Sequence, residues 1–151
     1  MPEVNKILVA ICFSEYCGGT FAYATRLATQ LQAELVVVNV INIKDVQALG
    51  RIESMGYSVS AEDYVKSVKE ELRAEFDKIL ADSGFPQEKS KIIFKVGHPF
   101  EKLLEITKEE KVDMVVMGAK GRGNVEHLLV GSVAEKMFRH SPVTVVSYRK
   151  R

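Results

Sequence analysis

The sequence contains few of the residues from which metal centres and disulfide frameworks are built. Its 151 residues include only two cysteines, Cys12 and Cys17, and three histidines, His98, His127 and His140. Four residues separate the two cysteines, and no second pair or nearby histidine completes a zinc pattern. We therefore expect reduced thiols, no metal site and no disulfide framework.

Long apolar runs and an excess of charge of one sign are also absent. The longest apolar runs, Ile7–Phe13 and Leu35–Val38, are too short to span a bilayer, and no charged-then-apolar leader precedes them. Lys and Arg together number 21 and Asp and Glu number 20, so the formal net charge is +1. This balance argues against nucleic acid and membrane surfaces as partners. We expect a cytoplasmic protein that binds neither.

The sequence does contain a regular alternation of short apolar runs and helical patterns. Two of the runs are almost continuously apolar, which is typical of strands buried on both faces of a parallel sheet. The predicted strands are Lys6–Cys12, Glu34–Ile41, Lys91–Val96, Asp113–Gly118 and Pro142–Tyr148. Such alternation predicts βαβ units with right-handed crossovers, and the length fits one α/β domain over residues 1–151.

Four segments between these strands have the periodicity of a helix with one apolar face. The apolar positions are Phe21, Ala24, Ala28 and Leu31 in the first, Tyr64, Val68, Leu72, Phe76 and Leu80 in the second, Phe100, Leu103, Leu104 and Thr107 in the third, and Val133, Ala134, Met137 and Phe138 in the fourth. Residues Asn42–Ser60 break this rhythm, because Gly50, Gly56 and scattered polar residues leave no clean period. We interpret this long connection as a mobile loop, with a lid as the alternative.

The segment after the fourth predicted strand contains the strongest functional pattern. From Gly118 to Ser132 it reads Gly-Ala-Lys-Gly-Arg-Gly-Asn-Val-Glu-His-Leu-Leu-Val-Gly-Ser. Glycines permit backbone conformations that other residues avoid, and they remove the Cβ atoms that would block a ligand. Successive backbone N–H groups in such a loop form a concave anion site, and Lys120 and Arg122 add positive charge beside it.

This segment leads into a helix whose start attracts anions. Ser132-Val-Ala-Glu135 is a predicted capping box, in which the serine side chain accepts a hydrogen bond from the N–H of Glu135. The unpaired N–H groups and the positive end of the helix dipole predict a phosphate near Gly131 and Ser132. Turn glycines and an ordinary helix cap would leave the same pattern, so the spacing alone leaves both interpretations open.

The expected order of the strands bears on this choice. In an open α/β sheet, ligands bind at the carboxyl ends of the strands, where the strand order reverses. If the order is 3-2-1-4-5, the first and fourth strands meet at that point and end at Cys12 and Gly118. The sequence contains no Gly-x-x-x-x-Gly-Lys-[Ser/Thr] phosphate loop and no complete dinucleotide fingerprint.

The spacing of the glycines resembles the signature of the ATP-binding universal stress proteins. In that signature, as here, Gly118-x-x-Gly121 is followed after nine residues by Gly131-Ser132. The similarity extends to Lys6–Ile11, Val37–Val40, Val96–Pro99, Val115–Gly118 and Ser141–Val143, and so to nearly the whole chain.

The resemblance implies a Rossmann-like, three-layer α/β/α domain with a five-stranded parallel sheet of order 3-2-1-4-5, similar to the adenine nucleotide α-hydrolases. It also implies ATP or AMP, with or without Mg²⁺, at the point where the strand order reverses. The nucleotide-binding residues that it implies are Ala10, Ile11, Cys12, Val40 and Met117 on the nucleoside side and Gly118, Lys120, Gly121, Arg122, Gly131, Ser132 and Val133 around ribose and phosphates.

One position departs from the family pattern. The family usually has Asp-Gly-Ser after the first strand, and this sequence has Cys12-Phe13-Ser14. An aspartate would accept a hydrogen bond from the nucleoside, and a thiol is a weak substitute. We therefore expect weaker nucleotide binding but not its loss, because the phosphate half of the pattern is intact.

Together these features predict a nucleotide-binding regulatory protein, with at most slow ATP hydrolysis or autophosphorylation. The resemblance implies a homodimer through the last strand, Pro142–Tyr148, whose apolar edge would be exposed. One alternative is a nucleotide-free dimeric interaction module, which Cys12-Phe13 favours. A second alternative is a flavin-binding electron carrier, because Ser14–Thr20 is faintly similar to a flavodoxin phosphate loop.

Overall fold

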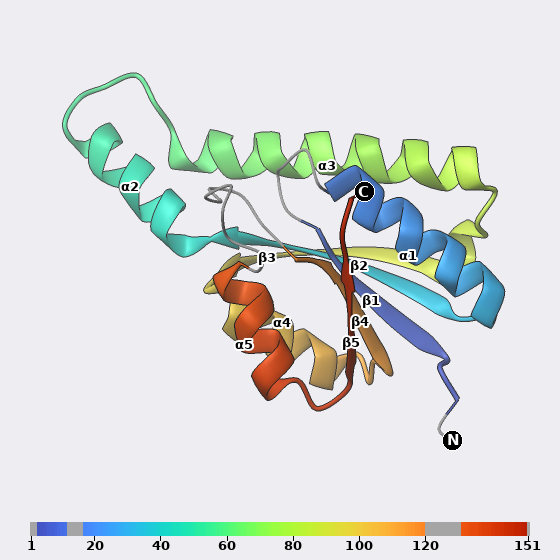
Figure 1. Cartoon of the computed structure of the whole chain (residues 1–151). Coiled ribbons are helices and arrows are strands. Elements are labelled where there is room, and N and C mark those ends of the chain that lie inside the picture. Colours follow the sequence, from blue (N-terminus) through green and yellow to red (C-terminus); the bar gives the residue numbers. More distant parts are fainter. Residues whose placement is uncertain (1–2, 12–16, 120–130, 151) are drawn as a thin grey trace.

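Five parallel strands form the centre of the molecule, and helices cover both faces of the sheet (Figure 1). The computed structural model describes residues 3–11, 17–119 and 131–150. The strands are β1 (Lys6–Ile11), β2 (Glu34–Asn42), β3 (Ser90–Gly97), β4 (Met114–Gly118) and β5 (Thr144–Tyr148). Their order is β3-β2-β1-β4-β5, and each neighbouring pair is parallel. The predicted three-layer fold and strand order are confirmed.

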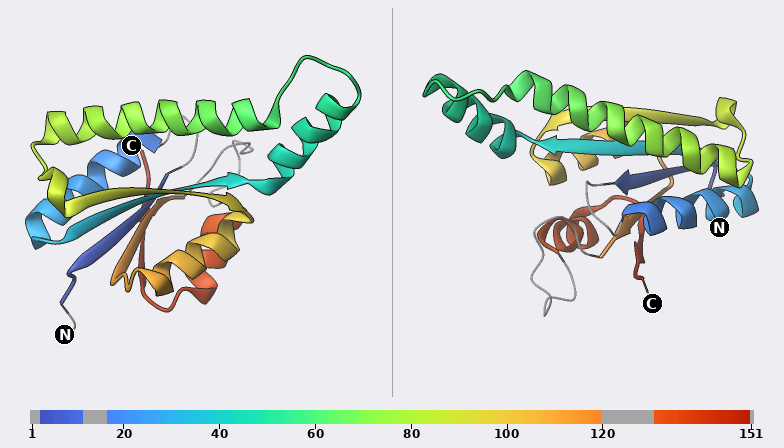
Figure 2. Two further views of the ribbon diagram at one scale, coloured as in Figure 1. Left: turned by 180° about the vertical axis from the view of Figure 1, so that it is seen from behind. Right: turned by 90° about the horizontal axis from the view of Figure 1, so that it is seen from above.

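The helices divide into two layers with separate apolar clusters (Figure 2). One face of the sheet packs against α1 (Cys17–Leu31) and α3 (Ala61–Ser83), and the other packs against α4 (Pro99–Glu109) and α5 (Ser132–His140). A short 3₁₀ helix, Gln87–Lys89, precedes β3. Phe21 of α1 and Phe76 of α3 anchor the first layer, with ring centroids 5.7 Å apart.

Most of the predicted helix faces are buried as expected. In α3, Val68, Leu72, Phe76 and Leu80 all lie in the core. Two positions were predicted wrongly: Leu31 and Phe138 are 43% and 42% exposed. Leu31 is the last residue of α1, where Gln32 reverses the chain with φ of 56°. Phe138 stays at the surface of the short helix α5, whose buried residues are Ala134 and Met137.

The interpretation of Asn42–Ser60 as a mobile loop was wrong, because most of it is the helix α2 (Ile43–Ser54). This helix buries none of its residues, which explains why the sequence shows no apolar period there. Local signals define it instead: the side chain of Asn42 caps the start by accepting from the N–H of Lys44 at 3.0 Å. At its other end, Glu53 Oε2 accepts from the N–H of Ala61 at 3.3 Å, which ties α2 to the start of α3.

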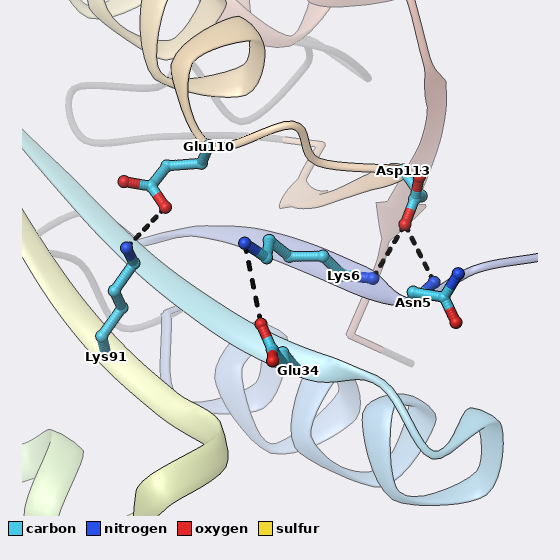
Figure 3. Close-up of polar contacts among 6 residues, drawn as sticks. All are labelled: Asn5, Lys6, Glu34, Lys91, Glu110 and Asp113. Atoms are coloured by element: carbon cyan, nitrogen blue, oxygen red, sulfur yellow. Dashed lines mark hydrogen bonds and ion pairs between the residues drawn. The ribbon is translucent and has the colours of Figure 1, made fainter.

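Hydrogen bonds and ion pairs connect neighbouring elements at the amino ends of the strands (Figure 3). The Oδ2 atom of Asp113, just before β4, accepts from the backbone N–H groups of Asn5 and Lys6, both at 2.9 Å. The Asp113 N–H donates in turn to the Lys6 carbonyl at 2.9 Å. Ion pairs join Lys6 to Glu34 and Lys91 to Glu110 at the same end. These contacts fix the starts of β1 and β4 relative to each other.

We expect the Asp113→Ala substitution to lower the free energy of unfolding by about 2 kcal/mol, because two charge-assisted hydrogen bonds to the backbone are lost. Urea denaturation measures this change. Asp77→Ala, on the exposed side of α3, is the matched control and should change stability by less than about 0.5 kcal/mol. Equal stabilities of the two variants would contradict this role of Asp113.

Candidate functional site

The two central strands diverge at their carboxyl ends. β1 and β4 are neighbours in the sheet, with Ala10 opposite Met117. After β1 the chain passes to α1 on one face, and after β4 it passes to α5 on the other face (Figure 1). This divergence is the topological switch point at which open α/β sheets bind their ligands. The predicted glycine segment thus begins and ends at the switch point, with Gly118 closing β4 and Gly131 preceding α5.

Four of the predicted site residues meet in one apolar cluster on the face covered by α4 and α5. They are Ala10, Val40, Met117 and Val133, which come from three strands and the first turn of α5. Met117 is buried, and the other three are only half-buried. A partly accessible surface of small and medium apolar side chains suits the face of a purine base.

The start of α5 differs from the predicted capping box. The helix begins at Ser132, so Gly131 is the N-cap residue, with φ of −77° and ψ of 163°, and within the described part of the chain no side chain caps this end. The N–H of Glu135 donates to the Gly131 carbonyl at 3.0 Å, and the Glu135 carboxylate pairs with Arg139 instead of reaching back. The predicted capping box was therefore wrong: the N-cap is Gly131, one residue before Ser132, and Ser132 is the first residue of the helix. Because the N-cap residue is a glycine, no N-cap side chain occupies the first N–H groups of α5, which suits an anion site.

The two ends of the glycine segment are joined at its base. The N–H of Gly131 donates to the carbonyl of Ala119 at 2.6 Å, and the N–H of Ala119 donates to the carbonyl of Tyr148 at 3.2 Å. Ala119, the residue that follows β4, is thereby held close to the start of α5. This arrangement brings the half-buried Gly118 and Gly131 to the same place, next to the apolar cluster.

The remaining predicted residues either lie outside the described part of the chain or face the other side of the sheet. Cys12, Lys120, Gly121 and Arg122 lie outside the described residues. The side chain of Ile11 packs in the cluster on the other face, beneath α1 and α3. Only the backbone of Ile11 therefore belongs to the edge where the nucleotide is predicted, and its carbonyl accepts from Asn39 Nδ2 at 3.0 Å.

Sequence reasoning missed two polar side chains near this edge. Asn39 is buried in β2, and its Oδ1 atom has no hydrogen-bond partner; the buried Oγ atom of Ser147 in β5 has none either. Ser147 stands opposite Met117 in the β4–β5 register, on the α5 face. A lone polar residue within an apolar strand was the available signal, because buried polar atoms without partners are rare.

Within residues 3–11, 17–119 and 131–150, no three His, Cys, Asp or Glu side chains gather as metal ligands would. No helix in these ranges is long and apolar enough to cross a membrane.

Comparison with known proteins agrees with this geometry. The model of the universal stress protein family matches residues 3–149. The chain belongs to the universal stress protein family. Universal stress protein MJ0577 of Methanocaldococcus jannaschii is 30% identical over 155 residues, and the match covers 94% of each chain. The solved structure of MJ0577 covers 99% of both chains with a TM-score of 0.79 and 26% identity. The family resemblance seen in the glycine spacing is confirmed.

Two structures with the universal stress protein fold are nucleotide complexes. One contains cAMP, is 20% identical and has a TM-score of 0.66 over 98% of both chains. The other is a universal stress protein of Archaeoglobus fulgidus with dAMP, which is 16% identical and has a TM-score of 0.67 over 98% of this chain and 100% of that one. At these identities the likeness shows the shared fold.

Proposed function

We propose that this universal stress protein binds ATP or AMP at the switch point and acts as a regulatory protein of the cytoplasm. The observation that carries the proposal is the contact between two suitable surfaces. The apolar cluster of Ala10, Val40, Met117 and Val133 lies next to the start of α5, whose N-cap residue, Gly131, has no side chain to cap the first N–H groups. A base on the first surface would place its phosphates at the second.

Nucleotide complexes of other universal stress proteins support an adenine nucleotide as the ligand. Universal stress proteins of this fold have been crystallised with cAMP and with dAMP. The residues that we assign to the site supply apolar contacts, backbone N–H groups and the positive charges of Lys120 and Arg122, but no general base. Bound nucleotide would therefore act chiefly as a ligand that changes conformation or partner choice, with hydrolysis or autophosphorylation slow at most.

Calorimetric titration of nucleotide-stripped protein with ATP and AMP, each with and without Mg²⁺, tests this proposal. Saturable binding of one nucleotide per chain is the expected result. If millimolar nucleotide gives neither heat nor thermal stabilisation, the proposal fails. The nucleotide-free interaction module, which Cys12-Phe13 favours, would then be the better account.

We further propose that two copies of the chain pair through the edge of β5. Both β3 and β5 are edge strands, but exposed Lys91 and Lys95 guard β3, whereas β5 from Thr144 to Tyr148 carries no charge. Natural edge strands use lysine to prevent pairing with other chains, and an uncharged edge invites it. This contrast supports β5 as the edge that accepts a partner.

We expect Val145→Pro to convert the dimer to a monomer. Because the carbonyl of Tyr148 faces β4, the alternation of the strand directs the backbone of Val145 outward, and proline removes that N–H donor. Val145→Ala loses the same side-chain packing but keeps the N–H, and should remain dimeric. Light scattering at micromolar concentration measures both. A monomeric wild type, or two dimeric variants, would contradict the β5 interface.

A further inference from the structure

The glycine at position 19, near the start of α1, has a structural reason that lies in the last strand. The side chain of Tyr148 in β5 rests on Gly19: a Cβ atom added at Gly19 would lie 2.8 Å from the Tyr148 hydroxyl oxygen and 2.9 Å from a ring carbon. One turn further along α1, the ring of Tyr23 packs against the ring of Tyr148, with centroids 5.5 Å apart and planes tilted by 37°. Gly19 and Tyr23 are four residues apart, so they present one stripe of α1 to this ring.

The same residue holds the base of the glycine segment through its backbone. The carbonyl of Tyr148 accepts from the N–H of Ala119, and the carbonyl of Ala119 accepts from the N–H of Gly131. Tyr148 therefore contacts both connections that leave the switch point: its ring touches the start of α1, which follows β1, and its carbonyl holds the segment that follows β4. Figure 1 shows the end of β5 beside the start of α1.

We propose that Tyr148 is a positioning residue for the nucleotide site. Its ring packs against the stripe of α1 formed by Gly19 and Tyr23 and so fixes the end of β5, an edge strand that pairs with β4 in the sheet. A fixed strand end keeps the Tyr148 carbonyl in place, and with it the hydrogen bonds of Ala119 and Gly131. The proposal rests on nucleotide binding at the start of α5, but the positioning itself can be tested without nucleotide.

Two substitutions disturb this contact from opposite sides. Tyr148→Ala removes the ring, and Gly19→Ala displaces it, because the ring is the flexible partner in the close contact. Each should weaken ATP binding by about threefold to tenfold, which is what the free energy of one aromatic contact allows. Tyr148→Phe keeps the ring and should stay within about twofold of wild type.

The chain offers a matched control for the glycine substitution. Gly50 lies within α2, and a Cβ atom there would meet nothing within 4 Å. Gly50→Ala brings the same gain in helix propensity as Gly19→Ala but should leave ATP affinity unchanged. In the double variant of Gly19→Ala and Tyr148→Ala, the glycine substitution should add no further loss, because the ring that it displaces is absent.

Hydrogen exchange at the Gly131 amide, measured by NMR on isotope-labelled protein, reports on positioning directly. We expect faster exchange in Tyr148→Ala and Gly19→Ala, with wild-type exchange in Tyr148→Phe and Gly50→Ala. Unchanged exchange in the first two variants would overturn the positioning role, whether or not the protein binds nucleotide. Faster exchange with unaltered ATP affinity would overturn its connection to the site. A wild type that binds no nucleotide would defeat the proposed function alone, because the exchange result still stands.

Discussion

The Gly131→Val variant should fold normally and bind ATP about a hundredfold more weakly than the wild type, or not at all. With φ of −77° and ψ of 163°, Gly131 has an extended backbone that valine adopts without strain, and its N–H can still donate to Ala119. The isopropyl group would cover the first N–H groups of α5, where we place the phosphates. Two lost hydrogen bonds to a charged phosphate account for a change of this size.

The control for this experiment is Gly50→Val, which puts the same side chain into open space on α2. It should bind ATP as the wild type does, and circular dichroism should show that both variants are folded. If Gly131→Val binds ATP with wild-type affinity, the phosphates do not lie at the start of α5. The assignment of the glycine segment would then be wrong even if nucleotide binding were real.

The layers of the fold could be predicted because burial leaves a strong periodic signal. Val36, Val37 and Val38 are all fully or almost fully buried, which requires helices on both sides of β2 and hence a parallel sheet. The helix α2 could not be predicted in this way. It buries no side chain, so only the cap at Asn42 and the charges of its end turns indicate it. Sequence patterns report packing well and locally stabilised helices poorly.

Part of the candidate site could also be predicted from the sequence, and part could not. Glycine spacing predicted a ligand site bounded by Gly118 and Gly131, which the fold places at the switch point, because a glycine has no Cβ atom to obstruct a ligand there. The contact of Tyr148 with Gly19 joins residues more than a hundred positions apart, and nothing in the sequence pattern links them. The same is true of Ser147, whose position beside Met117 depends on the register of two strands.

The second large change in ATP affinity is expected at Cys12, where the sequence departs from the expected family pattern. We expect Cys12→Asp to bind ATP about tenfold to a hundredfold more tightly than the wild type, because a carboxylate restores a charged acceptor for the nucleoside. Cys12→Ser is the matched control: it has the size of the cysteine and a neutral oxygen, so its gain should be much smaller. Calorimetric titration of the three proteins measures the difference.

Adenosine separates the two halves of the proposed site. It has the nucleoside but no phosphate, so Cys12→Asp should tighten adenosine and ATP by the same factor, whereas Gly131→Val should weaken ATP and leave adenosine unchanged. Because the two substitutions act on separate parts of one ligand, their effects on ATP should add in the double variant. If Cys12→Asp binds no more tightly than the wild type, the thiol costs nothing, and the nucleoside is held by the apolar cluster and the backbone alone.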